Sequence, residues 1–183
     1  MKVKNIRRTD TKKRIEESFT ALLRKRDIEG ITIKNITNYA KINRATFYAH
    51  YEDKYQLFDE MIKESASNKI DVYTKHINKW NNEQVLCLTQ AIFEYLNEVK
   101  INCPYSYQNL FPLLRKKMLM ELKQHLITLF SRMDNTKKNQ FEILIYSRVI
   151  YDAAEVIVTE ETNLTLHEVV KEINTLIDNN KEE

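Results

Sequence analysis

The sequence comprises 183 residues, of which 43% are hydrophobic and 30% are charged, and its formal net charge is +3. This length suits one ordinary domain or a large domain with a small module, and the apolar fraction argues against a disordered chain. Gly30 is the only glycine. Phosphate-binding loops, GxGxxG dinucleotide folds and tight β-hairpins need several glycines, so these classes of protein are excluded.

The positive charge is concentrated near the N-terminus. Residues 1–54 contain 14 basic and 7 acidic side chains, whereas residues 55–183 contain 15 basic and 19 acidic ones. A basic N-terminal segment followed by an acidic remainder is typical of a protein whose N-terminal segment binds a polyanion such as nucleic acid. A basic face that serves only solubility is the alternative.

The N-terminal residues show no signal for export or membrane insertion. Residues 1–17 lack the apolar core of a signal peptide, and no segment approaches the roughly 18 consecutive apolar residues of a membrane span. We therefore expect a cytoplasmic protein without membrane association, in which Cys87 and Cys103 are free thiols.

Apolar residues recur at helical spacing through almost the whole chain, which predicts an all-α protein of about nine helices. The first helix is expected to begin between Thr9 and Thr11 and to end near Asp27. Good capping residues then precede three further helices. These caps and helices are Thr32 before 33–40, Asn43 before 44–48, and Asp53 before a long helix from 54 to about 78.

The second half is expected to form long helices. One runs over about 83–102 and ends before Pro104, because the residue before proline disfavours helix. After an irregular aromatic stretch, Pro112 is predicted to be the first residue of the next helix. The remaining expected helices span about 112–133, 138–160 and 166–178, the last one opened by a capping box from Thr165 to Glu168.

Residues 31–50 have the pattern of a helix-turn-helix. Ile36, Ala40, Ile42 and Phe47 are spaced to meet between two crossing helices, and the three residues 41–43 form a turn of the expected length. If the second helix lay in a major groove, side chains near its N-terminus would reach the base edges.

The side chains expected to face outward suit contacts with DNA. Arg44 can pair with guanine, and the methyl groups of Ala45 and Thr46 can contact thymine. Tyr48, His50 and Lys54 can bind phosphate oxygens. A small helical cluster that merely packs is the alternative interpretation of the same residues.

The same stretch resembles the N-terminal DNA-binding domain of the TetR/AcrR family of transcriptional regulators. The most specific part is the run Tyr48-Ala-His50-Tyr51-Glu-Asp-Lys54, and the resemblance extends over about residues 9–65. The other matching residues are Thr32, Ile36, Ala40, Ile42, Asn43, Thr46, Phe47 and Leu57.

The resemblance implies roles for particular residues. Arg44, Ala45, Thr46 and Tyr48 would face bases or adjacent phosphates, and Thr32, Tyr48, His50 and Lys54 would anchor the DNA backbone. Two positions depart from the family pattern. Lys41 stands where a turn glycine is usual, which leaves the backbone conformation of the turn open because a residue with a Cβ is strained at positive φ. Ala45 replaces a common glycine early in the recognition helix.

The resemblance also implies an organisation and a function. Residues 1–53 would form a TetR-type DNA-binding domain with its helix-turn-helix at 31–50. Residues 54–183, beginning with a connecting helix at 54, would form an all-helical domain for ligand sensing and dimerisation. We expect a dimeric repressor that binds a palindromic double-stranded DNA operator and is released by a small-molecule effector. The alternative is a co-activator or adaptor of the same fold that acts by protein–protein contact without a small ligand.

The sequence supplies candidate surfaces for these functions. A homodimer through the last two helices would space two recognition helices about one DNA turn apart. The candidate dimer faces comprise Phe141, Leu144, Ile145, Arg148, Val149, Asp152 and Val156, and then Val169, Val170, Ile173, Leu176 and Ile177. A hydrophobic or aromatic effector could bind among Trp80, Phe93, Tyr95, Tyr105, Tyr107, Phe111, Met118, Met120, Phe130 and Met133, although such residues also suit a plain core.

No catalytic or metal-binding pattern is present in the sequence. The four histidines form no HxxxH or HExxH motif and no cluster with cysteine, and a single glycine rules out GxSxG. We therefore predict no enzymatic activity, no metal and no cofactor.

Overall fold

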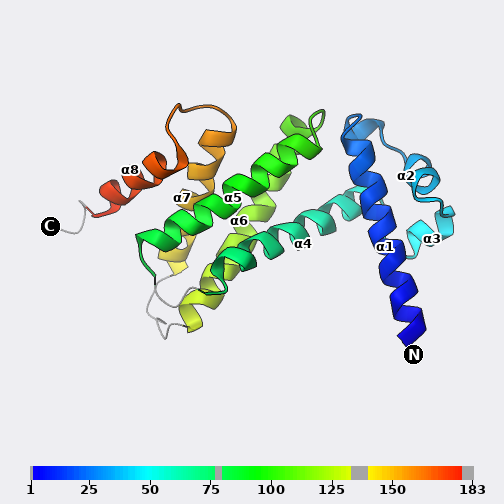
Figure 1. Ribbon diagram of the computed structural model, residues 1–183, viewed down its shortest axis with the longest axis horizontal. Coiled ribbons are helices and arrows are strands. Elements are labelled where there is room, and N and C mark those ends of the chain that lie inside the picture. Colours follow the sequence, from blue (N-terminus) through cyan, green and yellow to red (C-terminus); the bar gives the residue numbers. More distant parts are fainter. Residues whose placement is uncertain (1, 77–79, 133–139, 179–183) are drawn as a thin grey trace. The chain divides into compact units, whose positions relative to one another are not determined.

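The computed structural model describes residues 2–76, 80–132 and 140–178, and this part of the chain is all-helical (Figure 1). It contains eight α-helices, one 3-10 helix and no strand, which confirms the predicted fold class. The elements in order are α1 (Lys2–Leu23), η1 (Ile28–Gly30), α2 (Ile33–Ala40), α3 (Arg44–Tyr48), α4 (Lys54–Thr74), α5 (Asn82–Asn102), α6 (Tyr107–Arg132), α7 (Gln140–Val158) and α8 (Leu166–Asp178).

The helices whose first residues were predicted most accurately are those that begin with a side-chain cap. The hydroxyl of Thr32 accepts the backbone N–H of Asn35 at 3.2 Å, and Asn43 Oδ1 accepts that of Thr46 at 2.7 Å. Asp53 accepts two backbone N–H groups at the start of α4, both at 2.8 Å. The predicted capping box of α8 is also present, since Thr165 and Glu168 bond reciprocally. These caps satisfy N–H groups that have no partner inside the helix.

Three helix bounds differ from the prediction. α1 begins at Lys2 instead of between Thr9 and Thr11, α6 begins at Tyr107 instead of at Pro112, and α4 ends at Thr74 instead of near residue 78. Pro112 was expected to open α6 but lies inside it. The reason is that Tyr107 N–H donates to the Cys103 carbonyl at 2.8 Å, so helical hydrogen bonding is established before the proline. Pro112 then removes only the one bond that an N–H there would donate.

The chain divides into two compact units. The first, which we call the head, comprises residues 1–62 and 99–111, and the second, the body, comprises residues 63–98 and 112–183. The helices α4, α5 and α6 each have residues in both units. Packing therefore assigns the first turns of α4 and the segment 99–111 to the head, whereas the predicted domain boundary followed residue 53.

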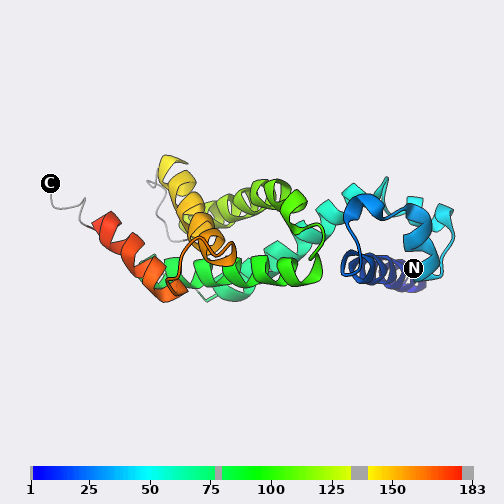
Figure 2. The same ribbon diagram turned by 90° about the horizontal axis from the view of Figure 1, so that it is seen from above.

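The head is held by a continuous apolar core. α1 and α2 pack side by side, as both ribbon views show (Figures 1 and 2), and α3 packs against α2. Phe19 of α1 meets Phe58 of α4 edge-on, with ring centroids 6.4 Å apart. The hydrophobic side chains of the head with 2% exposure or less are Ile15, Phe19, Leu23, Ile28, Ile31, Ile36, Phe47, Tyr51 and Leu57.

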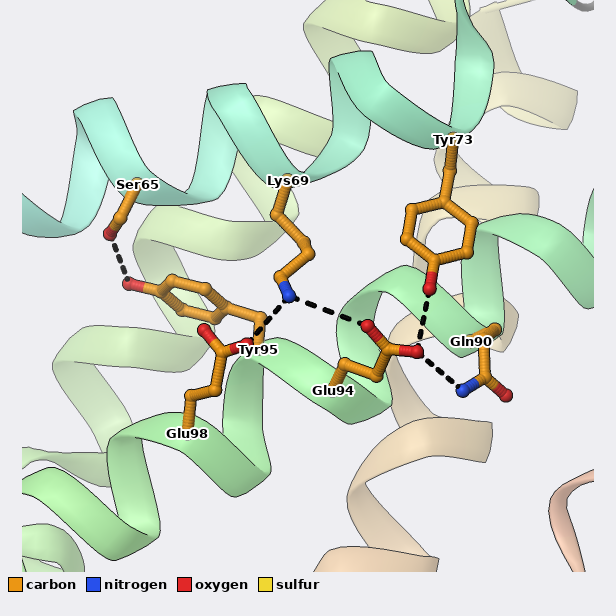
Figure 3. A network of polar contacts seen from close by, with 7 residues as sticks. All are labelled: Ser65, Lys69, Tyr73, Gln90, Glu94, Tyr95 and Glu98. Carbon is orange, nitrogen blue, oxygen red and sulfur yellow. Dashed lines mark hydrogen bonds and ion pairs between the residues drawn. The ribbon is translucent and has the colours of Figure 1, made fainter.

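In the body, a polar network joins α4 to α5 (Figure 3). The Lys69 ammonium lies 2.6 Å from a carboxylate oxygen of Glu98 and 3.4 Å from one of Glu94. Tyr73 and Gln90 also donate to Glu94, at 2.6 and 2.8 Å. One carboxylate thus accepts three donors from two helices.

The rest of the described body is joined by aromatic and charged contacts. The Trp80 ring packs edge-on against Phe130 and Tyr146, at 4.9 and 5.0 Å between centroids. Arg115 of α6 binds Asp152 and Glu155 of α7. None of the described helices has both the length and the apolar character needed to span a membrane.

The network around Glu94 predicts a pH dependence of stability. The Gln90 amide and the Tyr73 hydroxyl, with the Lys69 ammonium, lower the pKa of Glu94 below its ordinary value. An unfolded glutamate titrates near about pH 4.3. The network's contribution to the free energy of unfolding is therefore complete above that pH and is lost as the pH falls through the lower folded pKa.

We expect Glu94→Gln to be less stable than the wild type near neutral pH, with the difference shrinking as the pH falls from about 5 to about 3. Urea unfolding followed by circular dichroism at several pH values measures this difference. Parallel pH profiles for the two proteins would show that the carboxylate gains nothing from its three donors.

Candidate nucleic-acid interface

The turn between α2 and α3 closes by a well-defined hydrogen-bond pattern. The N–H of Ile42 donates to the Thr37 carbonyl at 3.0 Å, and that of Lys41 donates to the Asn38 carbonyl at 3.3 Å. Lys41 itself is left-handed, with φ 52° and ψ 48°. These are the features of a Schellman motif, in which glycine is the usual left-handed residue. Lys41 thus adopts the conformation usual for glycine, which costs roughly 1 kcal/mol for a residue with a Cβ.

The α3 helix has one buried side chain and an exposed outer face. Phe47 is 0% exposed and packs in the head core, where its ring is 5.8 Å from that of Tyr51. Arg44 and Ala45 are exposed, and Tyr48 is 55% exposed with its ring edge-on to Phe47 at 5.6 Å. The structure therefore places three of the predicted DNA-contacting residues together on the solvent side of α3.

Two threonines of the predicted site belong to helix caps. The Thr46 hydroxyl donates to Asn43 Oδ1 at 2.8 Å, and that of Thr32 donates to Asn35 Oδ1 at 2.8 Å. Thr46 is half-buried, whereas Thr32 is exposed. Because each hydroxyl hydrogen already has an acceptor, the γ-methyl group of Thr46 is its part best suited to a base contact.

His50 and Lys54 lie close to the core of the head. His50 is half-buried with its ring 6.2 Å from that of Tyr51. The Lys54 ammonium donates to the backbone carbonyls of Ile28 and Glu29 at 2.8 and 3.2 Å. The structure thus gives Lys54 an internal role as the link between α4 and η1, a role that the sequence did not predict.

A second set of contacts holds the connector between α1 and α2. The buried N–H of Ile28 donates to the hydroxyl of Ser106, which is 0% exposed, at 2.7 Å. Arg24 donates to Asn102 at 2.6 and 2.9 Å, and Asn109 donates to Asp27 at 3.4 Å. The segment 102–109 is far from this connector in sequence, and no sequence signal pointed to the pairing.

Comparison with known proteins identifies this head. Residues 20–61 match the family described as "Bacterial regulatory proteins, tetR family". This segment has the sequence of a TetR-family DNA-binding domain. The chain is 42% identical over 50 residues to YxbF, an uncharacterized HTH-type transcriptional regulator of Bacillus subtilis (strain 168), and the aligned segment is 27% of the present chain and 13% of YxbF. The solved structure of the dihydroxyacetone kinase operon activator DhaS aligns over 91% of this chain and 93% of its own, with 16% identity and a TM-score of 0.49.

The body has a groove between α4 and α6. Its volume is about 600 Å³, which lies in the range of small-molecule sites. His125 Nε2 lies 2.8 Å from Asp71 Oδ1 at this groove. The lining residues are Asn68, Asp71, Val72, Thr74, Lys75, Gln124, His125, Thr128 and Leu129.

The aromatic residues considered for an effector site are not gathered around this groove. Tyr105, Tyr107 and Phe111 belong to the head, and the other four aromatics belong to the body. Tyr95, Met118 and Phe130 are 3%, 0% and 2% exposed, so they pack as core. Met133 lies outside the described residues. A pocket formed by the remaining residues stays a prediction.

The two candidate dimer faces differ in exposure. On α7, Phe141 is 63% and Ile145 is 39% exposed. On α8, Val169 and Val170 are 8% and 3% exposed, because α8 packs against α7 within one chain. The side chains of Leu176 and Ile177 lie outside the described part. Among the described residues, no group of three metal-binding side chains comes together.

The contacts of Lys54 predict a structural effect that needs no DNA. We expect Lys54→Met to lower the free energy of unfolding by about 1 kcal/mol, because two carbonyl groups of η1 lose their donor. The exposed Arg44→Met is the matched control and should change it by less than about 0.5 kcal/mol. Urea unfolding measures both variants. If Lys54→Met were as stable as the wild type, the Lys54 ammonium would contribute nothing inside the head and would be available for phosphate.

Proposed function

We propose that this chain is a dimeric transcriptional regulator that binds a palindromic operator through its helix-turn-helix and acts as a repressor released by a small molecule. The observation that carries the proposal is the outer face of α3. Arg44, Ala45 and Tyr48 are exposed there, while Phe47 of the same helix is buried. A short capped helix with this division can enter a major groove without exposing apolar core.

The residue types on that face suit the reading of bases. The Arg44 guanidinium can donate two hydrogen bonds to O6 and N7 of a guanine, the commonest specific contact in the major groove. The methyl groups of Ala45 and Thr46 can contact a thymine methyl. These three side chains lie in the first turn of α3, where the helix would approach the base edges most closely.

Contacts with phosphate would come from the residues that flank this turn. The Tyr48 hydroxyl and the His50 imidazole suit phosphate oxygens, and Thr32 lies exposed at the start of α2. The excess of basic over acidic residues before position 55 favours the same partner. We propose that the protein acts in the cytoplasm, in contact with such DNA.

Dimerisation would use the last two helices, with α7 supplying the exposed surface. Phe141, Ile145, Val149 and Val156 follow one stripe of α7, and none of them is fully buried in the single chain. A second copy that covers this stripe would remove large apolar side chains from water. Two-fold symmetry would then present two α3 helices to successive major grooves.

An effector would act from the body. The groove beside α4 has a suitable volume, and α4 continues into the head, where Lys54 holds η1. A ligand that binds one conformation of the body more tightly than another shifts the population toward it. If the favoured conformation spaces the two heads wrongly, affinity for the operator falls.

We expect Arg44→Ala to weaken binding to a specific duplex by about 10- to 100-fold, because one base pair loses its bidentate partner. Tyr48→Phe should weaken it less, because it removes a single hydroxyl. The probe is a duplex selected by the wild-type protein from a randomised library, and affinity is measured by fluorescence anisotropy at several salt concentrations. Arg26→Ala removes the same charge from another exposed position of the head and is the control.

The salt series separates a DNA-binding regulator from an adaptor. Binding through several phosphate contacts should weaken steeply with salt, whereas a protein adaptor would select no duplex at all. If Arg44→Ala and Arg26→Ala bind the selected duplex equally well, α3 does not read its sequence.

We expect Phe141→Glu to convert the dimer to a monomer, because a charge at the centre of an apolar interface would lose its water. Sedimentation velocity at micromolar concentration gives the oligomeric state. Val72→Glu makes the same change at a 62% exposed apolar position of α4 and should leave the dimer intact. Dimers in both variants would place the interface away from Phe141.

A further inference from the structure

The carbonyl groups on either side of the left-handed Lys41 need hydrogen-bond donors from outside the turn. The two turn hydrogen bonds use the N–H groups of Lys41 and Ile42. The carbonyl groups of Ala40 and Lys41, on either side of the left-handed Cα, belong to the end of α2, where helices leave carbonyls without partners inside the helix. Because Lys41 has a Cβ, its left-handed backbone costs about 1–2 kcal/mol, so a donor to these carbonyl groups would stabilise the turn further.

A side chain from another helix holds both carbonyls. Arg14 of α1 is half-buried, and its Nη2 atom donates to the carbonyl oxygens of Ala40 and of Lys41, the latter at 3.3 Å. Arg14 is separated from the turn by more than 25 residues of sequence. One nitrogen atom therefore bridges two successive peptide groups of the turn.

This bridge restricts both backbone torsions of Lys41. The Ala40 carbonyl lies in the peptide plane on the N-terminal side of the Lys41 Cα, and the Lys41 carbonyl lies in the plane on its C-terminal side. Rotation about φ turns the first plane and rotation about ψ turns the second. A donor that keeps both oxygens within reach of one atom fixes the two planes relative to each other, and with them the direction in which the chain enters α3.

The helix that carries Arg14 is itself well fixed. Ile15 and Phe19 of α1 are 0% exposed. Two residues beyond Arg14, Glu16 accepts the hydroxyl of Tyr51, which follows α3, at 2.9 Å. α1 therefore contacts the chain both before and after α3, in agreement with its position beside α2 in Figures 1 and 2.

We propose that Arg14 is a positioning residue for the recognition helix. It holds the backbone of Lys41 in the left-handed conformation that glycine would adopt without help, and thereby fixes the direction of α3. The inference rests on the proposed DNA binding for its consequence, but the positioning itself is a property of the free protein.

The test compares four variants. Arg14→Met removes the guanidinium and keeps an unbranched apolar side chain, and Lys41→Gly removes the need for support. The double variant tests whether the second change rescues the first. Arg24→Met is the matched control, because it removes an arginine of the head that binds Asn102 and not the turn. Circular dichroism at the assay temperature verifies that each variant is folded.

Two measurements are made on each variant. Hydrogen exchange without DNA should show about tenfold faster exchange of residues 41–48 in Arg14→Met, no change in Arg24→Met, and restored protection in the double variant. Affinity for a duplex selected by the wild type should fall about tenfold in Arg14→Met and return to within about threefold of Lys41→Gly in the double variant.

Different outcomes would overturn different parts of the proposal. Unchanged exchange in Arg14→Met would overturn the positioning role, whatever the DNA result. Arg14→Met could also lose affinity that Lys41→Gly does not rescue, with a salt dependence lower by about one phosphate contact. This result would show that Arg14 binds DNA directly and would also overturn the positioning role. If the wild type selects no duplex, the proposed DNA-binding function fails, while hydrogen exchange still decides the role of Arg14.

Discussion

The direction of one short helix depends on a backbone conformation that most residues avoid. α3 has only five residues, so its own hydrogen bonds define its axis poorly, and the three-residue turn before it must define the rest. The direction of α3 is fixed because Phe47 is buried in the core and because Lys41 adopts a left-handed conformation. Side chains on the outer face can then be exposed and polar without weakening the head.

Local signals made most of the fold predictable from the sequence. The bounds of α2, α3 and α8 follow from caps that lie within three residues of the groups they bind, as at Thr32, Asn43 and Thr165. The sequence pattern also predicted that Arg44 and Tyr48 face outward from the core around Phe47, and both side chains are exposed. The prediction for Pro112 was wrong. It relied on the preference of proline for the first position of a helix, but the hydrogen bonds before Pro112 start the helix earlier.

Contacts between distant segments could not be predicted in the same way. A lysine at the start of a helix has the same sequence signature whether it faces phosphate or, as Lys54 does, the carbonyls of Ile28 and Glu29. Periodicity likewise gave two apolar faces on α7 and α8 but could not show that Val169 and Val170 are buried within one chain. Aromatic residues at helical spacing are equally compatible with a core and with a pocket, and Tyr95 and Phe130 belong to the core.

The buried bond between Ile28 and Ser106 has a consequence for the order of assembly during synthesis. Residues 1–62 contain the whole helix-turn-helix, yet the peptide hydrogen of Ile28 lacks its acceptor until a serine 78 positions later has left the ribosome. The nascent head therefore stays incomplete until the chain has emerged past its midpoint. Its final closure couples the maturation of the DNA-facing end to translation of the sequence that follows α5.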